Sequence, residues 1–170
     1  MTGLLPPDDD LELIHTRQYE TRVYVIDEQE VLVRGAVSDQ KPAGLYVTDD
    51  PLPLEIHQMQ VELRVSLPDL VITAARVGFE SHPTEACPSI ADHYGSLVGL
   101  SISRGFTHKV RELFGGPRGC THTTALLQAM APAVVQSTWS LAVRAARHAG
   151  RAPGASDDAS RRQRFAGNLN

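Results

Sequence analysis

Two cysteines stand at positions where a thiolate could bind a metal ion or attack an electrophile. Cys87 is followed by Pro88 and Cys120 by Thr121, and each cysteine stands at the start of an expected helix. A helix N-terminus presents free N–H groups and a partial positive charge, which lower the pKa of a thiol and favour thiolate. The sequence therefore points to thiolate chemistry at both helix starts.

Two histidines complete a candidate metal site. His122 follows Cys120 within the first turn of the same helix. In the segment 56–66, His57 and apolar residues occupy the odd positions, so alternation turns this imidazole toward the core. Two thiolates and two imidazoles form a tetrahedral zinc set in which the thiolates balance the charge of the ion. We therefore predict that Zn²⁺ is held by His57, Cys87, Cys120 and His122, with iron or an iron–sulfur centre as the second choice.

The same residues allow other interpretations. With three ligands, the metal would keep an open position for water and support hydrolase or lyase chemistry. Without a metal, Cys120 activated by His122 would be a thiol nucleophile, and Cys87 would be its resolving partner. A third interpretation is a non-catalytic accessory module that forms a homodimer through Trp139 and the longest helix. The sequence does not decide whether the protein is an enzyme, and its partner is an unidentified small molecule or protein.

Other polar residues receive simpler assignments. His82 lies in a loop close to Cys87 and is a candidate replacement ligand or proton donor. His15 flanks the core and is expected to face solvent. Asp39 follows an expected strand, where a turn-forming aspartate is the favoured interpretation.

The elements that must position these residues fall into two halves. The segments 21–26, 30–38, 56–66 and 71–79 are rich in β-branched residues or alternate in polarity, which predicts two hairpins. Helices are expected over 87–97, 106–114 and 121–148, with Pro132 bending or dividing the last one. Strands followed by helices indicate an α+β fold, in which an antiparallel sheet is covered on one face by about three helices.

Composition is typical of one globular domain: the chain has 170 residues, of which 42% are hydrophobic and 21% charged. We expect flexible segments at 1–14 and 149–170 around a single domain at 15–148, because both ends are poor in large apolar residues. A formal charge of −4 argues against a nucleic-acid partner, and no apolar run reaches the ~20 residues of a membrane span. Two cysteines and an acidic N-terminus favour a cytoplasmic protein with reduced thiols.

Several short motifs occur in a distinctive order. They are Ser38 to Pro42, Ile56 to Met59, Cys87-Pro88, and the stretch Gly115 to His122, which contains Gly-Cys-Thr-His. This order resembles an uncharacterised bacterial family, the domain of unknown function 2889, over nearly the whole core. Members usually have an acid where this chain has Gln58 and a leucine where it has Thr123. The family has no settled activity, so the resemblance implies none.

The stretch from His57 to the long helix also looks like the iron–sulfur scaffold proteins of the IscU type. In those proteins a cysteine heads a strand hairpin, a second starts the next helix, and a His-Cys pair opens a later helix. Cys87 matches the second cysteine, Cys120 with His122 resembles the pair in reverse order, and His57 takes the place of the first. The resemblance implies an IscU-like layout, and the loss of one thiolate favours zinc over cluster assembly.

Overall fold

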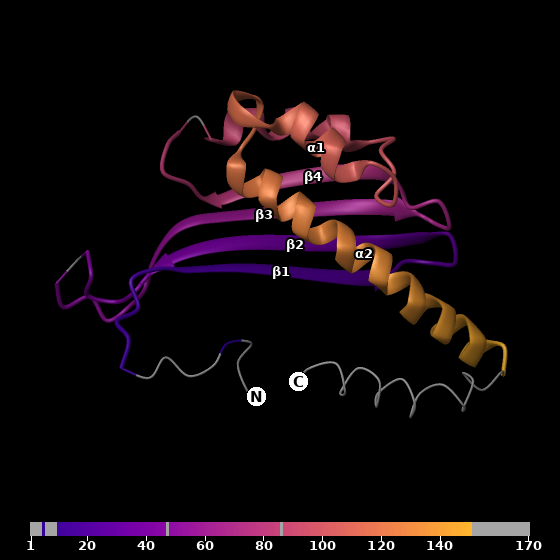
Figure 1. Ribbon diagram of the computed structural model, residues 1–170, viewed down its shortest axis with the longest axis horizontal. Coiled ribbons are helices and arrows are strands. Elements are labelled where there is room, and N and C mark those ends of the chain that lie inside the picture. Colours follow the sequence, from indigo (N-terminus) through magenta and orange to yellow (C-terminus); the bar gives the residue numbers. More distant parts are fainter. Residues whose placement is uncertain (1–4, 6–9, 47, 86, 151–170) are drawn as a thin grey trace. The chain divides into compact units, whose positions relative to one another are not determined.

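The sheet is a four-stranded antiparallel meander. The computed structural model describes residues 5, 10–46, 48–85 and 87–150. Strands β1 (Thr16–Val25), β2 (Glu30–Lys41), β3 (Leu54–Ser66) and β4 (Val71–Ser81) lie side by side in chain order (Figure 1). All four predicted strands are confirmed. β1 begins earlier than predicted, because the polar residues from Thr16 onward pair with β2, and Thr16 itself lies opposite Gln40.

The helices follow the sheet in sequence. A 3₁₀ helix, η1 (Cys87–Leu97), precedes α1 (Phe106–Phe114), the short η2 (Gly116–Arg118) and α2 (Thr121–His148). Pro132 lies inside α2 and does not divide it. Of the two predicted effects of Pro132, division of the helix is wrong, because proline removes one backbone hydrogen bond and the neighbouring turns hold the helix together. A bend at Pro132 stays a prediction. The α+β fold is confirmed.

Alternation along the strands separates an apolar inner face from a polar outer face. In β3, residues at odd positions from Met59 to Val65 are buried, whereas Gln60 and Arg64 are exposed. Side chains from the helices complete the core on the inner face. Its largest fully buried members include Leu63, Ile72, Tyr94, Phe114, Leu126 and Met130.

One inward position of β4 differs from simple alternation. Counting every second residue places Thr73 on the inner face, but Thr73 is exposed and Ile72 is 1% exposed. The pairing shifts here, since Arg64 lies opposite Ala74 while Val65 lies opposite Ile72. An extra residue in one strand reverses which side chains point inward. Because of this bulge, the prediction that Thr73 faces inward is wrong, and Ile72 faces inward instead.

The described part of the chain divides into two compact units between Val135 and Gln136, and this boundary falls inside α2. The first unit contains the sheet, η1, α1, η2 and the first part of α2. Most of the two predicted flexible ends, namely 1–4, 6–9 and 151–170, lies outside the described residues. The predicted single domain at 15–148 stays a prediction. No helix in the described part of the chain combines the length and apolarity needed to cross a membrane.

Candidate functional site

Three polar side chains form a row across one end of the sheet. Arg17 in β1 lies opposite Asp39 in β2, and Asp39 lies opposite His57 in β3. Directly opposed residues of antiparallel strands point to the same face. Asp39 continues the inward alternation of β2 and is only 1% exposed. The sheet thus carries a carboxylate into its inner face, flanked by a guanidinium and an imidazole.

The start of α2 brings a second imidazole to the same carboxylate. Nε2 of His122 lies 3.1 Å from Oδ2 of Asp39, and Nδ1 of His57 lies 3.1 Å from the same oxygen. The two imidazole rings are stacked with their centroids 4.0 Å apart. Both histidine side chains are mostly buried, with 19% of His57 and 15% of His122 exposed. Residues that are far apart in sequence therefore converge on one oxygen atom.

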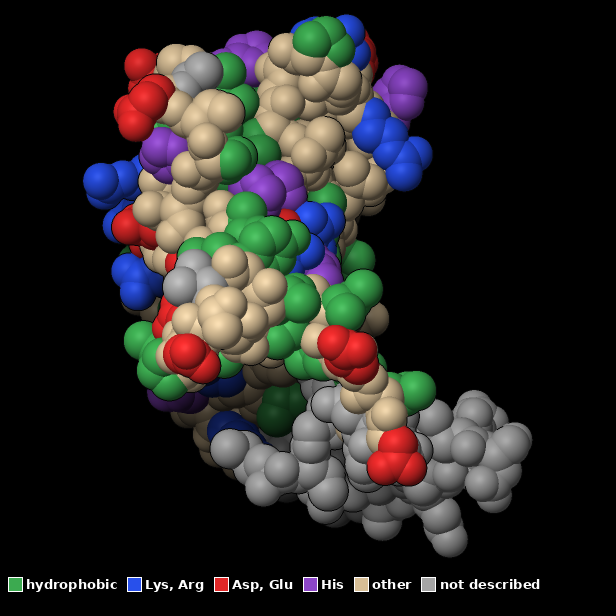
Figure 2. All heavy atoms as spheres, turned by 90° about the vertical axis from the view of Figure 1, so that its left-hand side faces the viewer, with side chains coloured by type: hydrophobic (Ala, Val, Ile, Leu, Met, Phe, Trp, Pro, Cys, Tyr) green, Lys and Arg blue, Asp and Glu red, His purple; other side chains and the backbone are tan. Residues whose placement is uncertain are grey.

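The carboxylate is also held by cations from the first strand. Arg17 donates from Nε to Oδ1 and from Nη2 to Oδ2 of Asp39, each over 2.6 Å. Nε2 of His15 lies 3.4 Å from Oδ1. Figure 2 faces the end of the sheet where β1 begins and β2 ends, and shows histidine, basic and acidic side chains gathered there. Asp39 is thus the shared partner of one arginine and three histidines.

The electrostatics of the cluster shift the pKa values of Asp39 and His122. The hydrogen bonds from Arg17 lower the pKa of Asp39 to about 2, although burial acts in the opposite direction. Burial lowers the pKa of His122, and the nearby His57 and Arg17 lower it further. Asp39 is therefore ionised, and His122 is neutral above its ordinary titration range.

Cys120 lies on the far side of the His122 ring. Its Sγ is 3.7 Å from Nδ1 of His122, the nitrogen that does not face Asp39. The N–H of Cys120 donates to the hydroxyl of Tyr94 over 2.9 Å, and its carbonyl accepts from the N–H of Thr124. Tyr94 is 1% exposed, and burial raises the pKa of its hydroxyl. η1 thereby holds the N-terminus of α2 in place through one partly buried hydrogen bond.

The residues predicted from the sequence divide into two groups. His57 and His122 belong to a set with Asp39 whose potential ligand atoms all lie within 4.8 Å of one another, the one such set among the described residues. Cys120 is next to this set, in contact with His122. Cys87 begins η1, and its Sγ lies 3.3 Å from Oγ1 of Thr84. Neither cysteine is a member of the set.

The structure also places the other two histidines considered from the sequence, His82 and His15. Nδ1–H of His82 donates to the carbonyl of Thr84 over 2.8 Å, in the loop that precedes Cys87. His15 is 38% exposed, yet it contacts Asp39, so the expectation that it only faces solvent is incomplete.

Sequence reasoning missed the central residue. Asp39 is part of β2 and not a turn residue, because the strand continues to Lys41. The inward positions Val31, Val33 and Val37 form an alternation that Asp39 extends. Extending this alternation to the end of the strand predicts that the carboxylate of Asp39 points inward. No comparable signal marks Arg17, because its role depends on pairing across strands.

Comparisons with known proteins give a family but no function. No curated protein and no solved structure matches the chain. The likeness to IscU-type scaffold proteins therefore stays a prediction. The family model described as a protein of unknown function, DUF2889, matches residues 15–136. The chain belongs to the DUF2889 family, as the motif order predicted.

Proposed function

We propose that this domain binds one divalent metal ion, with zinc as the first choice, at Asp39, His57 and His122. The observation that carries the proposal is the approach of two imidazole nitrogens to the same carboxylate oxygen, each at 3.1 Å. Zinc bonds to histidine nitrogen and carboxylate oxygen at about 2.0–2.2 Å. Two atoms bound to the same ion therefore lie roughly 3–3.5 Å apart, which the spacing at Asp39 fits.

The donor set narrows the chemistry. Two imidazoles and one carboxylate are three protein ligands, and catalytic zinc sites with three ligands keep a position for water or substrate. The same donors suit mononuclear iron(II), which is the second choice. Iron–sulfur clusters use thiolate ligands, and neither cysteine is in the set, so the donors disfavour a cluster. A zinc ion here would lower the pKa of a bound water and support hydrolase or lyase chemistry.

The proposal revises the ligand set predicted from the sequence. It keeps His57 and His122, adds Asp39, and gives Cys120 a supporting role. Metal-bound histidines usually donate their other ring N–H to a nearby acceptor, which fixes the ring. Sγ of Cys120 faces Nδ1 of His122 and is suited to be that acceptor. Cys87 is not required.

Metal analysis tests the proposal. Untagged protein purified without chelator should contain about one equivalent of zinc, as measured by elemental mass spectrometry. The variants Asp39→Ala, His57→Ala and His122→Ala should lose the metal, whereas the matched control Cys87→Ala should keep it. Metal that is lost in Cys87→Ala and kept in Asp39→Ala would instead support the thiolate set. Metal-free wild-type protein would overturn both.

A second candidate function is a metal-free thiol nucleophile, and the hydrogen bonds of His122 favour it. When Nε2–H of His122 donates to ionised Asp39, the lone pair of Nδ1 faces Sγ of Cys120. This is the order nucleophile, base and orienting carboxylate. His122 would take the thiol proton, the sulfur would bond to an electrophilic carbon, and the group displaced from that carbon would leave with the proton from His122. The ion pair between Arg17 and Asp39 also suits this candidate, because it already neutralises the carboxylate that a metal would need.

The position of one proton separates the two candidates. A metal at Nε2 of His122 requires the proton on Nδ1, whereas thiol activation requires the proton on Nε2. Nitrogen-15 NMR of the His122 ring distinguishes these tautomers. In a Cys87→Ala background, the thiol candidate further predicts that iodoacetamide alkylates Cys120 at least about tenfold more slowly after His122→Gln. An unchanged alkylation rate would exclude His122 as the base.

A further inference from the structure

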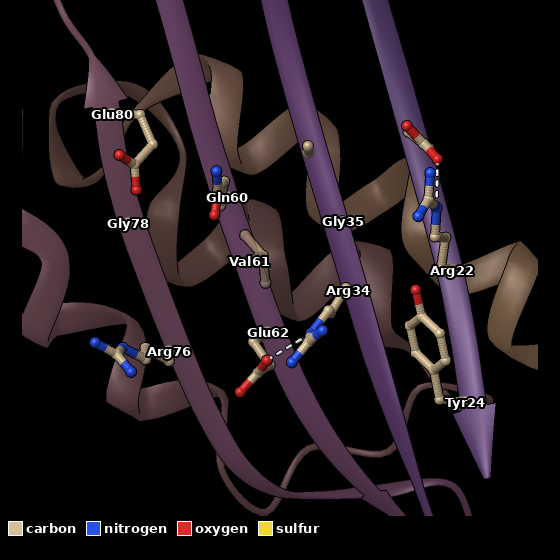
Figure 3. A pocket seen from close by; sticks show the side chains of 12 residues that line it. Arg22, Tyr24, Arg34, Gly35, Gln60, Val61, Glu62, Arg76, Gly78 and Glu80 are labelled. Carbon is tan, nitrogen blue, oxygen red and sulfur yellow. Dashed lines mark hydrogen bonds and ion pairs between the residues drawn. The ribbon is translucent and has the colours of Figure 1, made fainter.

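The outer face of the sheet, opposite the helices, contains a hollow that the proposed metal site does not use. It has a volume of about 610 Å³ and is lined by residues from all four strands (Figure 3). Ligand sites in proteins commonly enclose about 300–1,000 Å³. Figure 3 shows the strands in front, the lining side chains on them, and the helices behind. The hollow is therefore large enough for a small molecule and lies apart from the Asp39 cluster.

Charge is divided between the two ends of this hollow. One row across the strands joins Arg22, Arg34, Glu62 and Arg76, each opposite the next. The neighbouring row joins Glu20, Ala36, Gln60 and Gly78, and Glu80 lies just beyond it on β4. One end is thus mainly cationic and the other mainly acidic.

Internal ion pairs leave one charge unused at each end. Arg22 pairs with Glu20, and Arg34 pairs with Glu62 over 2.8 Å. Within the described residues, neither Arg76 nor Glu80 forms an ion pair or a side-chain hydrogen bond. Both are exposed, and they lie on β4 on either side of Gly78. The hollow therefore offers a free cation and a free anion along one strand.

Gly78 keeps the floor between these two charges open. A Cβ at this position would meet only Oε1 of Glu80, at 3.7 Å, so packing does not require glycine. Its backbone conformation does not require glycine either, because its φ is not in the positive range. Glycine inside a strand weakens the strand and often marks the close approach of a ligand. Gly35 differs, because a Cβ there would overlap Met130 of α2.

We propose that this hollow binds a short peptide with free termini, its carboxylate at Arg76 and its ammonium group at Glu80. Four residues of strand separate the two side chains, which is roughly 13 Å. An extended tripeptide spans about 10 Å, and the flexible arginine and glutamate side chains reach across the difference. Gln60 and the bare backbone at Gly78 face the middle of such a ligand. The proposal goes beyond the metal site and does not depend on it.

Titration of the full-length protein with trialanine tests the proposal, with amide chemical shifts followed by NMR. Shifts should be confined to the outer face of β1 to β4. Acetylation of the ammonium group or amidation of the carboxylate should each weaken binding about tenfold. Equal binding of the capped peptides would overturn the zwitterion assignment. If about 10 mM trialanine shifts no amide signal on the outer face, the Kd is weaker than millimolar. That result would overturn the site.

Matched substitutions on β4 locate the ligand. Gly78→Val should fill the hollow and weaken trialanine binding at least about tenfold, while Ala74→Val, exposed on the same strand outside the hollow, should not. Arg76→Gln and Glu80→Gln alter only surface charges, and each should also weaken trialanine binding. These two variants test the proposal even if Gly78→Val folds poorly. Binding that is unaffected by both charge variants would contradict the proposal, whatever the metal content of the protein.

Discussion

Asp39 is the residue on which the candidate site depends, and its carboxylate has less access to water than the guanidinium of its partner Arg17. Its carboxylate is 2% exposed, whereas the Arg17 side chain is 40% exposed. Removing one partner of a buried ion pair costs most when the charge that remains cannot be hydrated. The pair is therefore asymmetric: Arg17 can lose its partner more easily than Asp39 can.

Paired substitutions should reveal this asymmetry. Arg17→Gln leaves a buried carboxylate without its strongest partner, and we expect it to reduce the free energy of unfolding by about 3 kcal/mol. Asp39→Asn leaves a guanidinium that water still reaches, so the expected loss is smaller, about 2 kcal/mol, as for protonation of the same carboxylate. Urea unfolding of the metal-free protein at pH 7 measures both values. Equal losses would show that exposure does not control the energy of this pair.

Acid should weaken the fold through the same carboxylate. The pKa of Asp39 is lowered from 3.8 to about 2 in the folded protein, so the stabilisation is complete above about pH 4 and is lost as the pH falls toward 2. A shift of this size corresponds to about 2 kcal/mol. In urea unfolding of metal-free protein between pH 5 and 2, wild type should lose about 2 kcal/mol more than Arg17→Gln. Parallel pH profiles would contradict the assigned cause of the shift.

At the scale of elements, the site forms where several elements begin or end. Arg17 lies near the start of β1, Asp39 near the end of β2, and His57 near the start of β3. His122 reaches them only because α2 starts at this end of the sheet. Gly119 precedes that start and lies against α1: a Cβ there would be 2.6 Å from the carbonyl oxygen and 2.9 Å from Cβ of Phe114. Close contact between this loop and α1 therefore fixes where α2 begins.

Gly119→Ala should disturb both stability and the site. The added methyl meets backbone that cannot move aside cheaply, and we expect a loss of about 2 kcal/mol in the free energy of unfolding. The displaced start of α2 should also separate the His122 ring from Asp39, and so weaken zinc binding. Gly95→Ala in η1 is the control, because a Cβ there meets nothing within 4 Å. Thermal unfolding and zinc titration measure the two effects. A Gly119→Ala protein with wild-type zinc affinity would show that this contact does not position His122.

At the scale of the molecule, two independent boundaries nearly coincide. The first compact unit ends at Val135, and the family model ends at residue 136. The sheet, the Asp39 cluster and the outer hollow all belong to residues before this boundary. The family is thus defined by the part of the chain that carries both candidate sites.

A chain that ends at residue 136 should therefore keep the fold and the Asp39 cluster. We expect it to unfold in a single cooperative transition and to bind the same amount of zinc as the full-length chain. Circular dichroism and elemental analysis check the two expectations. Loss of the transition, in a protein whose full-length form unfolds cooperatively, would show that residues 137–170 are part of the folding unit.

The sequence by itself determined the order of elements, the inward face of β3 and two of the three residues in the proposed metal site. Local physics is sufficient for these features: alternation turned His57 inward, glycine and proline ended α1, and helix-start signals placed His122 at the beginning of α2. The predicted inward face of β3 is confirmed from Met59 to Val65. The face predicted for β4 is wrong at Thr73, because a bulge is a property of two strands together.

Only the tertiary structure decided which polar groups share a partner. Strand register sets Arg17, Asp39 and His57 in one row, and the packing of α2 on the sheet brings His122 to the same carboxylate oxygen. The cysteines carried the strongest local signal, yet contact with Asp39 depends on distances between elements, which neither propensity nor spacing along the chain contains. The hollow at Gly78 also depends on the tertiary structure, because the pairing of four strands brings its charged side chains together.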